Sequence, residues 1–242
     1  MFDKLPLLLD DKDLTKHLFV EPYPHLVIEN ALSKEQIEFI RSQKENLRVW
    51  KNDFYGSYRT DYLIPEANYT DMFNKLCDVF DLQEFKKETV LYGKNNATQK
   101  SVSVNGVLSV YHQDKIANQV SSHAPLGPHR DREQKMIICL LYLGQEGDNL
   151  GGDLLLYKAE PSDSKGRQND ESIELAKTVP YAPGTLVIFP NGKTSVHAVG
   201  EREDGPFDRA MVCITFECFS PEWISRVVTI EKSKEYKRKI TK

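Results

Sequence analysis

Apolar residues recur at helical spacing in the first 100 of the 242 residues. Ser33 and Gln36 form a Ser-x-x-Gln capping box, which predicts a helix start, and apolar residues follow it at intervals of one helical turn. A second helix is predicted after Thr70, where several apolar residues share one helical face. These residues are Met72, Phe73, Leu76, Val79 and Phe80. Before both helices, an extended segment is expected to enter a strand at His25–Ile28.

After about residue 100 the pattern changes to short apolar runs rich in β-branched residues and separated by Gly, Pro, Asn and Asp. The runs are Val102–Tyr111, Lys135–Leu143, Asp153–Tyr157, Thr185–Phe189 and Arg209–Phe219. Helices followed by strands predict an α+β, mainly β domain. We expect a jelly-roll-like double sheet with the N-terminal helices packed on one sheet. The predicted layout is one domain over 1–242: a helical support region (1–100), a jelly-roll core (101–220) and a C-terminal tail (221–242).

The net charge and the cysteine pattern argue against several classes of function. The net charge is -4, which gives no general attraction to nucleic acid. The four cysteines include no Cys-x-x-Cys pair, which argues against a zinc ribbon or a thioredoxin motif. The first residues lack the apolar run of a signal peptide, and no apolar stretch approaches the roughly 18 residues of a membrane span. We therefore expect a cytoplasmic protein with reduced thiols, no nucleic-acid partner and no membrane partner.

The segment Gly127-Pro128-His129-Arg130-Asp131 carries the first candidate chemistry. In an extended segment residues i and i+2 face the same way, so His129 and Asp131 can point into one cavity. We predict that His197, which follows a turn at 190–192, supplies a third ligand. Two histidines and one carboxylate on one face of a metal ion leave three positions open, as in the facial triad of non-haem Fe(II) oxygenases. We interpret the other four histidines, which lack such a partner at i+2, as surface or core residues: His17, His25, His112 and His123.

Around these residues the sequence resembles the prolyl-4-hydroxylase-like branch of the 2-oxoglutarate oxygenase superfamily. The resemblance covers roughly residues 102–219, with a weaker similarity at 18–40. It rests on an ordered set of segments: the H-x-D at 129–131, Gly151-Gly152-Asp153-Leu154, Pro183-Gly184-Thr185-Leu186-Val187-Ile188-Phe189-Pro190, His197-Ala198-Val199, Arg209 at the start of the last core strand, and the early Pro22-Tyr23-Pro24-His25-Leu26-Val27-Ile28.

The resemblance implies the cofactors, the residues that bind them and the reaction. Fe(II) would be held by His129, Asp131 and His197, and 2-oxoglutarate would chelate it. Arg209 would grip the far carboxylate of 2-oxoglutarate with its planar fork. Tyr111 would donate to the same cosubstrate, and Thr185 or Thr215 could add a hydroxyl. With O2, and with ascorbate as a possible reductant, such enzymes hydroxylate unactivated C–H bonds. Related halogenases carry a small residue at the position of Asp131, so its carboxylate favours hydroxylation.

The substrate class stays open at this point. We expect a small molecule, such as an amino acid or a natural-product intermediate, handled by a monomer or homodimer. The alternative is a peptidyl, prolyl-type hydroxylase acting on a protein or peptide. More remote alternatives are a non-catalytic jelly-roll binding protein and a zinc hydrolase with the same three ligands. The polar segments 113–127 and 159–175 are longer than the family pattern. We predict that 159–175, with part of 113–127, forms a lid over the entrance, and the alternative is a surface insertion with no role.

Overall fold

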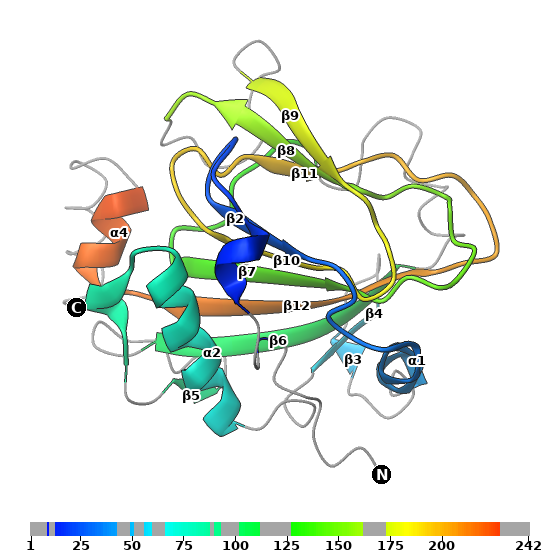
Figure 1. Cartoon of the computed structure of the whole chain (residues 1–242), viewed down its shortest axis with the longest axis horizontal. Helices are drawn as coiled ribbons and strands as arrows, with labels where there is room; N and C mark the ends of the chain where they lie inside the picture. Colours follow the sequence, from blue (N-terminus) through cyan, green and yellow to red (C-terminus); the bar gives the residue numbers. More distant parts are fainter. Residues whose placement is uncertain are drawn as a thin grey trace.

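The computed structural model describes residue 9 and residues 13–42, 49–50, 56–59, 66–87, 90–92, 102–111, 127–161 and 173–227. Within these residues two β-sheets lie face to face (Figure 1). The large sheet has the strand order β1-β2-β10-β7-β12-β6-β4-β3, and β5 pairs in parallel with β6. The small sheet has the order β11-β8-β9. Apart from β5, neighbouring strands are antiparallel. This is the predicted double sheet of a jelly roll.

The element bounds are as follows. The large sheet contains β1 (Leu18–Phe19), β2 (His25–Ile28), β3 (Val49–Trp50), β4 (Gly56–Arg59), β5 (Leu91–Tyr92), β6 (Val102–Tyr111), β7 (Lys135–Tyr142), β10 (Leu186–Pro190) and β12 (Arg209–Cys218). The small sheet contains β8 (Leu154–Ala159), β9 (Ile173–Val179) and β11 (His197–Val199). The α-helices are α1 (Lys34–Ser42), α2 (Glu66–Val79) and α4 (Pro221–Val227), and the short 3-10 helices are η1 (Leu14–His17) and η3 (Gln83–Phe85).

The large sheet separates two apolar cores. On its outer face, buried residues of α1, α2 and α4 pack against Ile137, Cys139 and Leu141 of β7. On its inner face, Ile138, Leu140 and Tyr142 of the same strand pack with residues of β8 and β9. Figure 1 shows the helices on the side of the large sheet opposite the small sheet. Because β7 is buried on both faces, its sequence is a continuous apolar run with no visible alternation.

One irregularity interrupts this alternation at the start of β7. Phe216 pairs with Ile137, but Glu217 pairs with Lys135, so Met136 is an extra residue on the β7 side. Met136 is fully buried in the helix-side core, the same core that holds Ile137. This β-bulge changes the phase of the strand, so Lys135 takes the register of the inner face opposite Glu217.

The structure confirms the capping box and corrects several boundaries. The Ser33 amide donates to Gln36 Oε1 at 2.8 Å, and the Gln36 amide donates to Ser33 Oγ at 3.3 Å. The helix predicted after Thr70 begins earlier, at Glu66. In the described residues no helix has both the length and the apolar character needed to cross a membrane.

The predicted division of the chain was wrong in three places. Residues 1–100 are not only helical support: β2 confirms the strand predicted at His25–Ile28, and β1, β3, β4 and β5 also extend the large sheet. The tail predicted from residue 221 begins with α4, whose Trp223 and Ile224 are buried in the helix-side core. Strand β9 begins at Ile173, inside the segment 159–175 predicted as a loop. The rest of that segment, 162–172, and most of the other predicted lid, 113–126, lie outside the described residues, as do residues 228–242.

Candidate metal and cosubstrate site

The backbones of the two predicted histidine ligands are hydrogen-bonded to each other. The His129 amide donates to the His197 carbonyl at 2.9 Å, and the His197 amide donates to the His129 carbonyl at 3.0 Å. The two rings lie side by side, with centroids 4.4 Å apart. This isolated antiparallel bridge joins the H-x-D segment to the start of β11. Residues 68 positions apart in the sequence (197 minus 129) are thereby fixed at one end of the barrel.

Both imidazole rings are oriented by the same local contact. His129 Nδ1 lies 2.9 Å from the Gly127 carbonyl oxygen, and His197 Nδ1 lies 3.0 Å from the Ser195 carbonyl oxygen. A carbonyl oxygen only accepts, so each Nδ1 carries the hydrogen and each Nε2 keeps a lone pair. Burial lowers the pKa of His197 to about 4, although the nearby Asp131 opposes the shift. His197 is therefore neutral at neutral pH, which is the form that binds a metal ion.

Asp131 completes the group with a carboxylate. Its Oδ2 lies 3.9 Å from His197 Nε2, and its Oδ1 accepts a hydrogen bond from Lys135 Nζ at 2.6 Å. Burial is the largest single effect and raises the pKa of Asp131, but the charge and the hydrogen bond of Lys135, together with the two histidines, outweigh it. The pKa of this carboxyl therefore lies below its usual value. The carboxylate is ionised at neutral pH.

The donor set fits a divalent metal ion. Two imidazole Nε2 lone pairs and one carboxylate are the ligands of the two-histidine, one-carboxylate Fe(II) sites. No three His, Cys, Asp or Glu side chains of the described residues meet at the spacing of a completed metal centre. In this arrangement the Asp131 carboxylate is bonded to Lys135 rather than drawn in between the two rings.

Asn191 ties the two ligand segments together, and the sequence pattern had placed it only in a turn. Its buried side-chain amide donates to the carbonyls of Arg132 at 2.9 Å and Lys135 at 3.1 Å, in the turn that follows Asp131. Its Oδ1 accepts from Ser195 Oγ at 3.1 Å, and Ser195 supplies the carbonyl that orients His197. One buried side chain therefore links the H-x-D turn to the loop before His197.

Arg209 lies on the inner face at the opposite end of the strands from Lys135. It is 4% exposed, and its Nε donates to the Gly152 carbonyl at 3.0 Å. Its guanidinium carbon lies 5.4 Å from the ring centre of Tyr142 and 5.0 Å from that of Tyr181. A guanidinium packed on two aromatic rings is held in one orientation, as bidentate recognition of a carboxylate requires.

Tyr142 is the cosubstrate candidate that the sequence pattern did not reveal. Its side chain is fully buried, and its hydroxyl has no hydrogen-bond partner among the described residues. Burial raises the pKa of Tyr142 well above its usual value despite the opposing charge of Arg209, so the hydroxyl stays protonated. A buried hydroxyl without a partner is costly. Beside Arg209, it offers a second donor to a carboxylate placed there.

The backbone conformation at residues 151 and 152 explains why both positions are glycine. Both residues have positive φ, +85° and +86°, which side chains disfavour. A Cβ on Gly152 would also lie 3.0 Å from Cδ and Nε of Arg209. Arg202, a second buried arginine near these glycines, is engaged by the protein itself, because its guanidinium donates to Asp148 at 2.8 Å and to the carbonyls of Gly151 and Phe207.

Of the remaining predicted residues, some are buried in the described part of the chain and others lie outside it. The backbone of Tyr111 pairs with Arg209 in the β6–β12 ladder, but its side chain lies outside the described residues. Thr215 is buried on β12, in the register of the inner face, and Thr185 is buried just before β10. His112 and His123 lie outside the described residues. His25 is a core histidine, as predicted, stacked on Phe19.

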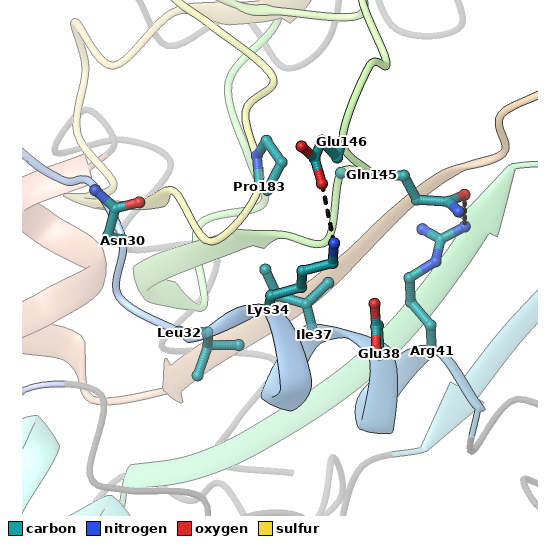
Figure 2. A pocket seen from close by; sticks show the side chains of 10 residues that line it. Asn30, Leu32, Lys34, Ile37, Glu38, Arg41, Gln145, Glu146 and Pro183 are labelled. Carbon is teal, nitrogen blue, oxygen red and sulfur yellow. Dashed lines mark hydrogen bonds and ion pairs between the residues drawn. The ribbon is translucent and has the colours of Figure 1, made fainter.

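A separate surface pocket of about 560 Å³ lies beside α1. Figure 2 shows two contacts across it, from Lys34 to Glu146 and from Arg41 to Gln145. Among its lining residues are none of the three predicted metal ligands and not Arg209. The candidate site is thus distinct from this pocket.

Comparison with known proteins bears on the fold. No protein-family model matches the sequence, and no curated protein matches it. A prolyl 4-hydroxylase from Phytophthora capsici matches in structure with a TM-score of 0.44 and 16% identity, over 80% of this chain and 58% of that chain. This chain therefore spans less than two thirds of that enzyme. A Pseudomonas putida prolyl-4-hydroxylase matches with a TM-score of 0.43 and 14% identity, over 80% and 92% of the two chains.

HygX from Streptomyces hygroscopicus, with nickel, 2-oxoglutarate and hygromycin B bound, matches with a TM-score of 0.47 and 13% identity, over 80% of this chain and 82% of that chain. These TM-scores are all below 0.5 at low identity, and the roles of individual residues rest on their own geometry.

Proposed function

We propose that this protein is an Fe(II)- and 2-oxoglutarate-dependent dioxygenase that hydroxylates an unactivated C–H bond of a small molecule, such as an amino acid or a natural-product intermediate. The observation that carries the proposal is the meeting of His129, His197 and Asp131 at one end of the barrel. The two rings have centroids 4.4 Å apart, each has its Nδ1 on the carbonyl two residues before it, and His197 Nε2 lies 3.9 Å from the Asp131 carboxylate. The core residue His25 has the same contact with the Tyr23 carbonyl, so the convergence of two such rings and a carboxylate is what supports a metal site.

The metal ion, once bound, would supply the activation of O2 coupled to oxidative decarboxylation of 2-oxoglutarate. The chain's own residues have simpler roles. His129, Asp131 and His197 would hold the ion on one face. Arg209 and Tyr142 would bind the far carboxylate of 2-oxoglutarate by a charged fork and a hydroxyl. The two apolar cores around the barrel keep water from the inner face.

Metal and cosubstrate assays test this function. His129→Ala, Asp131→Ala and His197→Ala should each abolish succinate formation from 2-oxoglutarate and leave the far-UV circular dichroism unchanged. Loss of a ligand should exceed the roughly 10–100-fold effect of a neighbouring residue. The wild-type protein is assayed across a panel of amino acids and peptides, with succinate and hydroxylated product measured together. If all three variants form succinate at the wild-type rate, the proposed metal site is wrong. Coupled turnover of peptides alone would replace the small-molecule substrate with the peptidyl alternative.

A further inference from the structure

Lys135 is a cation in the interior of the barrel, beside a proposed metal ligand. Its side chain is 26% exposed and that of Asp131 is 13% exposed, and Nζ lies 2.6 Å from Asp131 Oδ1. The Lys135 ammonium donates a hydrogen bond to this one oxygen of Asp131, and Glu217 pairs with Lys135 across the strand.

The bulge at Met136 is what brings Lys135 to this position. In a regular strand Lys135 and Ile137 would share a face, and Ile137 lies in the helix-side core. Lysine buried among apolar side chains without a partner is costly. The extra residue places Lys135 opposite Glu217, on the inner face with Asp131. Asn191 fixes the same bulge, because its backbone amide donates to the Met136 carbonyl at 2.9 Å and its side chain donates to the Lys135 carbonyl.

The two oxygens of Asp131 thus have different partners. Oδ1 is engaged by Lys135, whereas Oδ2 is the oxygen nearest His197 Nε2, at 3.9 Å. A carboxylate can bind a metal ion through one oxygen or through both. An octahedral ion offers about six positions, so a ligand set with both oxygens bound would leave two open positions instead of three. Chelation by 2-oxoglutarate together with O2 needs three.

We propose that Lys135 is a positioning residue that holds Asp131 Oδ1 away from the metal, so that the carboxylate binds through Oδ2 alone and three positions stay open. The inference rests on the proposed function, because it assigns Asp131 as a metal ligand. Lys135 acts through Asp131 and does not touch the metal ion. The bulge at Met136 is therefore part of the construction of the site.

Mn(II) binding, measured by the loss of its free-ion EPR signal, and the affinity of the Mn(II)-loaded protein for 2-oxoglutarate, measured by calorimetry, test the proposal. Lys135→Met removes the bond to Oδ1, and Lys158→Met, on the exposed part of β8, is the matched control. Because both oxygens of Asp131 can then reach the ion, we expect Lys135→Met to bind Mn(II) at least as tightly as the wild type but to bind 2-oxoglutarate roughly 10–100-fold more weakly. Lys158→Met should match the wild type in both affinities. Lys135→Arg, which keeps a cationic donor, should recover most of the affinity for 2-oxoglutarate.

The outcomes separate this inference from the function it rests on. Wild-type affinity for 2-oxoglutarate in Lys135→Met overturns the role of Lys135, while loss of Mn(II) binding in Asp131→Ala still supports the metal site. Wild-type Mn(II) binding by Asp131→Ala overturns the metal site itself. If Lys135→Met fails to fold, Lys135→Gln keeps a neutral donor to Oδ1. The proposal then requires Lys135→Gln to bind 2-oxoglutarate more weakly than Lys135→Arg, and equal or tighter binding overturns it.

Discussion

Tyr142 and Tyr181 are neighbouring buried tyrosines with opposite hydrogen-bond situations. The rings are 5.2 Å apart, and both lie beside Arg209. The Tyr181 hydroxyl donates to the Ala210 carbonyl at 3.0 Å and accepts from the Ala210 amide at 2.8 Å. The Tyr142 hydroxyl has no such partner among the described residues. At the residue scale, therefore, one hydroxyl is used by the fold and the other is left for a ligand.

This contrast gives a prediction for cosubstrate affinity. Tyr142→Phe should raise the KM for 2-oxoglutarate about tenfold to a hundredfold, the value of a hydrogen bond to a charged group at about 1.5–3 kcal/mol. Its melting temperature should not fall, because no protein contact is lost. Tyr181→Phe should show the reverse: an unchanged KM, and a lower melting temperature because two hydrogen bonds to the Ala210 backbone are lost. Arg209→Ala should raise the KM by at least as much as Tyr142→Phe. Succinate release and thermal melts measure both quantities. An unchanged KM in Tyr142→Phe would place the far carboxylate elsewhere.

At the scale of elements, the site depends on two departures from regular strands. The bulge at Met136 aims Lys135 inward, and the left-handed glycines at 151 and 152 let the chain pass close to Arg209 before β8 begins. Neither feature contacts the metal position. Both decide which way a charged side chain points, and both depend on pairing between distant strands.

Gly152→Ala tests the second departure. The new Cβ would meet Arg209 at 3.0 Å at a φ of +86°, so both the backbone and the guanidinium are displaced. We expect a loss of roughly 1–3 kcal/mol in the free energy of unfolding and a higher KM for 2-oxoglutarate. Gly192→Ala is the matched control, because a Cβ there meets nothing within 4 Å. Urea melts and cosubstrate titrations on both variants measure these effects. Identical behaviour of the two alanine variants would contradict the close packing of Gly152 on Arg209.

At the scale of the whole molecule, local patterns predicted what local residues determine. The capping box predicted the start of α1, the apolar run at His25–Ile28 predicted β2, and alternation of side chains predicts His129 and Asp131 on one face. The strands β1, β3, β4 and β5 could not be found in this way, because they have two to four residues and are defined by distant partners. Tyr142 lies in an apolar run that is buried on both faces, so the pattern of apolar and polar residues did not distinguish it from core residues. The bulge that aims Lys135 exists only against β12.

Stability against pH is also a property of the whole molecule. Burial is the main effect that lowers the pKa of His25, and the charge of Lys177 lowers it further, whereas the bond to the Tyr23 carbonyl opposes this. The unfolded chain, with a histidine pKa of about 6.5, then binds more protons than the folded chain. The free energy of unfolding should therefore fall as the pH decreases below about 6.5. His25→Phe should show a smaller decrease between about pH 7 and about pH 5, measured by urea melts. Parallel profiles for the two proteins would contradict this.

The ion pair between Lys135 and Asp131 has a consequence for the order in which the protein folds and binds its metal ion. Small zinc domains stay unfolded until their ion arrives, because their ligands have no other partners. Here Lys135 provides a counter-charge to the largely buried carboxylate of Asp131. We expect synthesis and folding to finish first and loading to come afterwards. The iron-free protein should then be isolable in folded form and open to exchange among divalent ions.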